Sequence, residues 1–254
     1  MSRAARLRLF LTGAAVLAAV LIAAADGLPA FGGPDHPYGD RAVEAGLARR
    51  AANIVSSVNF DQRAFDTLGE ESILFASVLG ATMLLRLARD EHRRRPAPAR
   101  VLPSTRLFGA TLLPVALLTG GYLVAHGQLT PGGGFQGGVV LATALHLAYV
   151  AADYRVLRRV RPLAVLDVAD ALSAGAFAAL GLIGLAAGAG YLANTLPLGT
   201  FGALFSGGLV PVVNAVVGVE VGSGVVVLLA RFLDQAVEVV PDRAGARGTD
   251  GGEG

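Results

Sequence analysis

Long runs of apolar residues constrain this chain more than any other feature of its sequence. Six segments each approach the length of about 20 residues that an apolar α-helix needs to cross a bilayer. With 54% hydrophobic and only 16% charged residues, the chain is less charged than soluble domains, in which about a quarter of residues carry charge. The sequence therefore predicts an all-α integral membrane protein, a helix bundle whose spans are 8–25, 70–88, 107–125, 134–152, 170–190 and 209–231.

The positions of the basic residues predict the orientation of these spans. All of them are arginines, and most lie before the first span, between spans two and three, between spans four and five, or after span six. Because cytoplasmic loops carry an excess of positive charge, this pattern predicts six transmembrane helices with both termini in the cytoplasm. The arginines left on the other side are Arg41, Arg49, Arg50 and Arg63.

Three segments need a separate interpretation. Span 8–25 has a basic start and an apolar centre, as a cleaved signal peptide does. We expect a retained helix, because its removal would put the arginine-rich loop after span two on the wrong side unless the other spans inverted. Residues 41–60 mix apolar and charged side chains and predict an amphipathic helix at the membrane surface. The polar, glycine-rich residues 237–254 predict a disordered tail.

Ionisable residues within the spans are the candidates for function, because burying them in a membrane is costly. Glu220 lies in the middle of span six and His146 in the middle of span four. Asp61, Arg63, Asp66, Glu70 and Glu71 lie at the mouth of span two, where Asp66 and Glu70 share one face of any helix that has already begun. We expect an ion path to use Asp66, Glu70, His146 and Glu220.

Each of these residues also has a purely structural interpretation. Glu220 and His146 can make a hydrogen bond or an ion pair with a neighbouring helix. Carboxylates near helix N-termini are favoured by the helix dipole alone, and this applies to Asp66, Glu70, Asp167 and Asp170.

Several kinds of chemistry are disfavoured by the sequence. The chain has no cysteine, and its histidines and acids show neither metal-ligand spacing nor a Ser-His-Asp grouping. Gly132, Gly134 and Gly137 match a dinucleotide fingerprint, but apolar spans flank them where a strand is required. We therefore expect no catalytic residues, metal, cofactor or nucleic-acid partner, and hence no enzyme.

Glycines spaced four residues apart predict close helix packing. Such small-xxx-small pairs let helix backbones approach each other in lipid. They occur at Gly134 and Gly138, at Gly184 and Gly188, and at Gly218 and Gly222, on either side of Glu220.

The stretch "HGQLTPGGGFQGGVVLA" resembles the signature of the MnhB/MrpB-type subunits of multisubunit Na+/H+ antiporters. The similarity extends over about residues 104–236 and includes "VVNAVVGVEVGSGVVVLL". In that family the pattern joins the first two of four helices. The matching residues are His126, Pro131, Gly132, Gly133, Gly134, Phe135, Gly137 and Gly138.

A second resemblance precedes the first. "DQRAFDTLGE" is similar to a segment near the C-terminus of the large MnhA/MrpA-type antiporter subunits, which also occurs in the small MbhE-type subunits of membrane-bound hydrogenases. This resemblance implies a fusion, with an MbhE-like part at 1–92, a basic linker at 93–103 and an MnhB-like domain at 104–236. The matching residues are Asp61, Arg63, Phe65, Asp66, Thr67, Leu68, Gly69 and Glu70.

Together the resemblances imply a membrane subunit of a monovalent cation/proton antiporter that works within a hetero-oligomer. Na+ and H+ would be the transported ions, the bilayer of the cell membrane its surroundings, and other antiporter subunits its partners. Two alternatives stay open. One is a subunit in the membrane arm of a hydrogenase or complex-I-related ion pump, and the other is a purely structural packing subunit.

Overall fold

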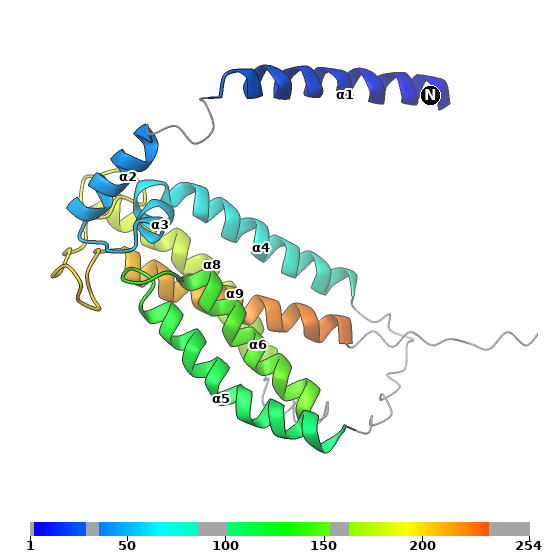
Figure 1. The fold of residues 1–254 in the computed structure, drawn as a ribbon, viewed down its shortest axis with the longest axis vertical. Helices are drawn as coiled ribbons and strands as arrows, with labels where there is room; N and C mark the ends of the chain where they lie inside the picture. Colours follow the sequence, from blue (N-terminus) through cyan, green and yellow to red (C-terminus); the bar gives the residue numbers. More distant parts are fainter. Residues whose placement is uncertain (1–2, 29–35, 86–100, 153–162, 234–254) are drawn as a thin grey trace, which may run out of the picture. The chain divides into compact units, whose positions relative to one another are not determined.

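The chain folds into α-helices in the computed structural model, which describes residues 3–28, 36–85, 101–152 and 163–233. Within these ranges the regular secondary structure is entirely helical (Figure 1). The basic linker, apart from its last three residues, and the C-terminal tail lie outside the described residues. The helices are α1 (Arg3–Asp26), α2 (Pro37–Ala48), α3 (Ile54–Ser57), the π-helix η1 (Val58–Gln62), α4 (Ala64–Leu84), α5 (Pro103–Ala125), α6 (Gly134–Ala152), α8 (Leu163–Ala186) and α9 (Val210–Leu233).

The chain divides into two units, residues 1–41 and residues 42–254. The first unit contains α1, whose apolar residues are exposed along its whole length. Four helices, α1, α5, α8 and α9, are long and apolar enough to cross a membrane. The apolar part of α6 is shorter than this, and α4 carries acidic residues. Membrane helices are thus confirmed, whereas six spans and cytoplasmic termini stay predictions.

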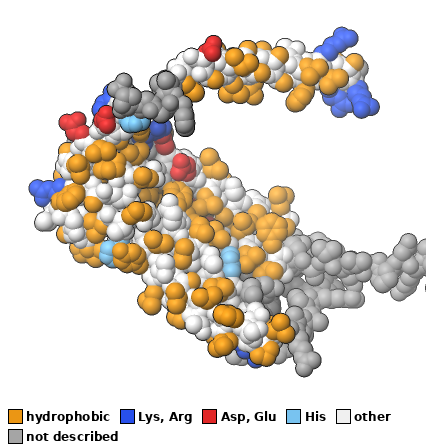
Figure 2. All heavy atoms as spheres, in the orientation of Figure 1, with side chains coloured by type: hydrophobic (Ala, Val, Ile, Leu, Met, Phe, Trp, Pro, Cys, Tyr) orange, Lys and Arg blue, Asp and Glu red, His pale blue; other side chains and the backbone are white. Residues whose placement is uncertain are grey.

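Helix α9 forms the centre of the second unit. It packs against α4, α5, α6 and α8, and it is the most buried of the four span-length helices. The surrounding helices expose many large hydrophobic side chains, and Figure 2 shows one such face of the molecule. This arrangement suits a bundle in lipid, where the outer faces need no polar groups, and most of α9 is covered by protein while apolar residues such as Val219 stay exposed.

Glycines set the distance between α6 and α9. A Cβ added to Gly138 would lie 2.8 Å from the Cβ of Val221 and 2.9 Å from the carbonyl oxygen of Gly218. A Cβ on Gly134 would likewise lie 2.7 Å from the Cβ of Val217. The predicted close packing is therefore confirmed for the glycines of α6 and α9.

The pair Gly184 and Gly188 does not form a helix contact of this kind. Helix α8 ends at Ala186, and Gly188 follows it with a positive φ of 77° and open space around it. Gly184 faces the loop that returns from the same helix, near Ala193. The prediction was wrong here because the helix stops before the second glycine.

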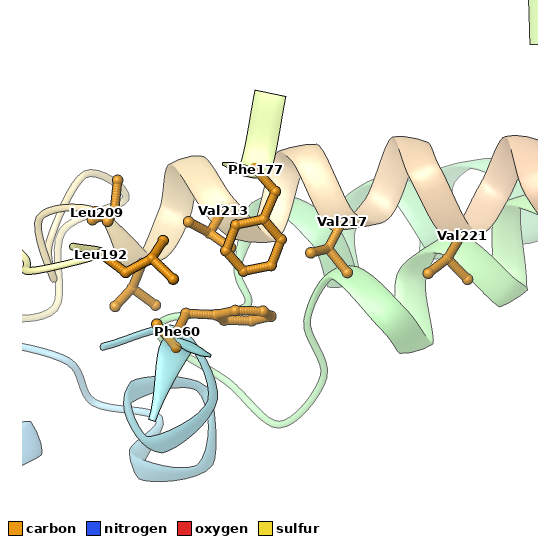
Figure 3. Close-up of a cluster of buried hydrophobic side chains, with 9 residues drawn as sticks. Phe60, Phe177, Leu192, Leu209, Val213, Val217 and Val221 are labelled. Carbon is orange, nitrogen blue, oxygen red and sulfur yellow. The ribbon is translucent and has the colours of Figure 1, made fainter. Parts of the chain in front are cut away.

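An apolar cluster joins α9 to its neighbours near its N-terminal end (Figure 3). Phe60 of η1 and Phe177 of α8 meet the buried valines of α9, and both rings are almost fully buried. The cluster is completed by Ala64, Leu192, Leu209, Val210, Val213, Val217 and Val221. Its members come from segments far apart in sequence, so it holds the bundle together at this end.

Residues 41–60 do not form a single surface helix. Helix α2 ends at Ala48, and the chain then turns into α3 and η1. Ser56, Ser57 and Phe60 are almost completely buried. The prediction of one amphipathic helix was wrong because the second half of this stretch packs into the end of the bundle.

Two helices begin earlier than their apolar runs suggested. Helix α4 begins at Ala64, with Asp66 in its first turn, as its N-terminal interpretation requires. Helix α8 is described from Leu163, so Asp167 and Asp170 lie within the helix and not at its N-terminus. The apolar residues 163–166 extend it, and the helix dipole no longer accounts for Asp170.

We predict that Gly138→Ala destabilises the bundle, whereas Gly175→Ala does not. The first methyl group would collide with Val221 and with α9 backbone, and overpacking of this kind costs about 1–3 kcal/mol. The second methyl group meets open space on α8. Thermal unfolding of the detergent-solubilised protein measures the difference. Equal midpoints for the two variants would contradict the close approach of α6 and α9.

Candidate functional site

Three buried carboxyl groups from three helices gather around α9. They belong to Glu71 of α4, Asp170 of α8 and Glu220 of α9, which are 1%, 4% and 0% exposed. Among the described residues, no hydrogen-bond donor reaches either carboxylate oxygen of Glu71 or Glu220, or Oδ1 of Asp170. Buried polar groups are almost always hydrogen-bonded, so this arrangement calls for an explanation.

Glu71 and Glu220 form the centre of this group. Their carboxyl groups face each other within hydrogen-bonding reach, and each also interacts electrostatically with Asp170. Two carboxylates offer each other only acceptor oxygens, but a single proton between them supplies the missing donor. The pair is therefore built so that one proton can satisfy two otherwise unpaired side chains.

Asp170 lies next to this pair, on the side toward the C-terminal end of α9. Its Oδ1 atom would lie 3.0 Å from a Cβ on Gly224, one helical turn after Glu220, and Val78 of α4 packs at the same place. Asp170 also interacts electrostatically with Asp167, one turn nearer the start of α8. Nη2 of Arg231 donates a 3.0 Å hydrogen bond to Oδ2 of Asp167, so an ion pair, and not a helix N-terminus, accounts for this acid.

The acids chosen from the sequence are placed differently. Asp66 and Glu70 both lie on the exposed side of α4, and Nε of Arg63 donates a 2.6 Å hydrogen bond to Asp66. The structure therefore brings Glu71, and not Glu70, to Glu220. His146 is partly buried on α6, a helix that contributes none of the three carboxyl groups.

The sequence contained only weak signals for the two residues that were missed. Glu71 directly follows Glu70, and adjacent helical residues point about 100° apart, so only packing decides which one is buried. Asp170 was assigned to a helix start, although the apolar residues before it allowed α8 to begin a full turn earlier.

The glycine-rich loop between α5 and α6 is fixed by a buried asparagine of α9. Asn214 accepts a 2.8 Å hydrogen bond from the backbone N–H of Gly134 and donates one of 2.9 Å to the hydroxyl of Ser56. A Cβ on Gly133, whose φ is 137°, would lie 2.7 Å from Oδ1 of Asn214. The glycines thus let the loop close tightly around this side chain.

The loop is also tied to the segment before α4. Asn53 donates hydrogen bonds of 2.7 and 2.8 Å to the carbonyl oxygens of Gly127 and Thr130. His126 stacks on Tyr122 with ring centroids 4.1 Å apart, at the exposed end of α5. The loop is therefore a helix junction held by protein, as non-helical backbone at membrane depth requires.

Residues of the second motif make structural contacts at the same end of the bundle. Asp61 accepts a 3.0 Å hydrogen bond from Asn194, and Thr67 donates one of 2.6 Å to the carbonyl oxygen of Asn59. Arg49 lies 3.8 Å from Asp61 and bonds the carbonyl oxygen of Asn194. These bonds fix where α4 begins, and so which of its residues faces α9.

Known membrane proteins resemble this chain in sequence and in fold. Residues 104–227 match the family model described as a domain related to the MnhB subunit of Na+/H+ antiporter. A chain of the membrane-bound sulfane sulfur reductase, an archaeal respiratory membrane complex, is 30% identical with a TM-score of 0.69. The alignment covers 90% of this chain and 98% of that one, so it extends well before residue 104. The chain belongs to the MnhB-related family.

Two further proteins resemble this MnhB-related chain. A chain of the Mrp complex from Dietzia sp. DQ12-45-1b has the same fold, with 23% identity and a TM-score of 0.64. The match covers 91% of this chain but only 26% of that much longer one. An uncharacterized protein of Methanocaldococcus jannaschii is 27% identical over 220 residues, which are 75% of this chain and 80% of that protein. The MbhE-like identity of residues 1–92 stays a prediction.

We predict that Asn214→Ala destabilises the MnhB-related bundle far more than Thr143→Ala. The first change leaves the N–H of Gly134 and the hydroxyl of Ser56 without this partner in a buried site, which costs about 1–3 kcal/mol for each unsatisfied group. Thr143 is exposed and bonds only its own helix. Thermal unfolding in detergent compares the two. If the Asn214→Ala protein unfolds at the same temperature as the wild type, the loop does not depend on this side chain.

Proposed function

We propose that this chain is a membrane subunit of a multisubunit monovalent cation/proton antiporter, and that its buried carboxyl groups carry protons during transport. The observation that supports the second part is the pair of Glu71 and Glu220, fully buried, mutually adjacent and without a donor among the described residues. Family membership supports the first part, and the apolar outer faces place the chain in a membrane, for which we propose the cell membrane.

The energetics of the site favour a transport role over a purely structural one. A structural ion pair would bring a cationic partner to each acid, as Arg231 does for Asp167. The three central carboxyl groups instead lie near one another, an arrangement of like charges that a structural ion pair would avoid. A group of this kind exchanges protons readily when its surroundings change, whereas it contributes little to stability.

The outer surface supports work within a hetero-oligomer. Glu70 is exposed on α4, one turn before the large exposed apolar side chain of Ile73. A carboxylate on this face meets lipid unless another protein covers it, and lipid exposure of a charge is costly. The two similar solved structures are both multisubunit membrane complexes. We therefore propose other membrane subunits as the partners of this chain, with Na+ and H+ as the transported ions.

A second candidate function has its own supporting observation. The sulfane sulfur reductase chain is more similar to this chain than the Mrp chain is, and it matches along nearly its entire length. The same subunit could therefore serve the membrane arm of a respiratory or hydrogenase-type complex. The proton-carrying role of the buried acids is the same in both settings, and the partners differ.

The co-purifying subunits distinguish these two settings. We predict that a mild-detergent purification of the tagged chain from its native membrane yields large antiporter-type subunits, identified by mass spectrometry. Redox subunits in the same eluate would instead favour the respiratory alternative. Recovery of the chain alone, from membranes in which the neighbouring subunits are shown to be present, would contradict both.

We predict that Glu71→Gln and Glu220→Gln each abolish cation/proton exchange by the assembled complex, because glutamine keeps the shape of the side chain but cannot exchange a proton. The matched control is Glu44→Gln, since Glu44 is exposed on α2. Proton movement in membrane vesicles after a cation pulse measures the activity, and co-purification confirms assembly. Unchanged exchange in an assembled Glu220→Gln complex would exclude the proton-carrying role.

A further inference from the structure

We propose that the Glu71–Glu220 pair exchanges protons with only one side of the membrane, the side at which α9 ends, by a route past Asp170 and Asp167. The inference rests on the proposed function and adds a direction to it. In the orientation that the arginines predict, this side is the cytoplasm.

A series of neighbouring carboxyl groups marks the route. Glu220 interacts with Asp170, Asp170 lies against Gly224, and Asp167 lies one turn further along α8. Helices α8 and α9 run in opposite directions here, since Asp167 of α8 pairs with Arg231 near the end of α9. Each step therefore moves away from the centre of α9 and toward its C-terminal end.

Exposure increases in the same direction. Glu220 is fully buried, Asp170 is 4% exposed, and the side chain of Asp167 is 39% exposed. Glycine at position 224 leaves the space beside α9 that Oδ1 of Asp170 occupies. A methyl group there would lie 3.0 Å from this oxygen and 3.3 Å from Val78, so a larger residue would displace the acid from the route.

The opposite direction is closed by apolar packing. On α9 the buried residues before Glu220 include Val213 and Val217, which belong to the apolar cluster (Figure 3). Phe177 of α8 fills the same layer and is fully buried. On α4, which carries Glu71, Ala64 belongs to the cluster and Leu68 packs against it. The side chains of the cluster offer no acceptor, and the buried polar side chains beside it, Thr67 and Asn214, are already engaged in hydrogen bonds. A proton needs acceptors or water at each step, so this layer does not conduct it.

The proposed step moves protons only. A proton leaves the Glu71–Glu220 pair as an O–H bond breaks, and a new O–H bond forms on the carboxylate of Asp170. From there the proton passes to water at the partly exposed end beside Asp167, and the pair is left with one more negative charge. No electron moves and no other bond changes.

A pair of matched cysteine variants tests the direction of access. The chain has no cysteine, so each variant carries a single thiol in this subunit. Val78→Cys places the thiol beside Asp170 and Gly224, and Val217→Cys places it within the apolar cluster. Both valines are buried, at 3% and 0% exposure, so burial alone does not separate them.

The experiment adds silver ions, which are small enough to follow a narrow polar route, to oriented vesicles that contain the assembled complex. Loss of thiol labelling after denaturation reports the reaction. We expect Val78→Cys to react when silver is added at the side where α9 ends and not from the other side, and Val217→Cys to react from neither side. Where Val78→Cys does not assemble, Ser173→Cys, one turn along α8 from Asp170, replaces it.

Three other outcomes would contradict the proposal. Reaction of Val78→Cys only from the other side, from both sides, or from neither side would overturn the one-sided route. This readout does not depend on transport, so it fails separately from the proposed function. An unreactive Val78→Cys in a complex that loses exchange with Glu220→Gln would remove the route and leave the proton-carrying role in place.

Discussion

The close approach of α6 and α9 is the contact on which the rest of the structure depends. Glycine at 134 and 138 lets the backbone of α6 lie directly against α9, and Gly218 accommodates Val124 of α5. With this side of α9 covered by helix backbone, and α4 and α8 packed against it as well, the side chain of Glu220 is fully buried. Small residues at helix contacts therefore create the dry environment that makes a carboxyl group there unusual.

The polar groups of α9 are separated along its length according to their roles. Asn214 is fully satisfied and holds the glycine-rich loop, while Glu220, less than two turns later, has no donor among the described residues. The apolar cluster lies between the loop and the carboxyl groups. One end of the bundle is thus fixed by hydrogen bonds, and the three buried carboxyl groups lie beyond the apolar cluster, from the middle of α9 toward its C-terminal end.

The sequence predicted the helical membrane fold, the close packing of the glycines of α6 and α9, and the position of Glu220 inside a membrane helix, because all three follow from local pattern. Long apolar runs identify the helices, and an acid in the middle of such a run stands out because burying a charge in a membrane is costly. It did not predict Glu71 or Asp170. Whether Glu70 or Glu71 faces α9 is decided by where η1 ends and α4 begins, which depends on hydrogen bonds of Asp61 and Thr67 to distant residues or to the preceding turn. Likewise, Gly184 and Gly188 fitted the contact pattern, but the helix ends between them.

Infrared difference spectroscopy detects whether Glu71 and Glu220 hold one proton between them. Spectra of the assembled complex at neutral pH would be recorded for the wild type and for the double variant Glu71→Gln/Glu220→Gln, in light and heavy water. We expect the variant to lose the C=O stretch of one protonated carboxyl group, identified by its shift in heavy water. Loss of ionised carboxylate bands alone would show two charged groups and would exclude a shared proton.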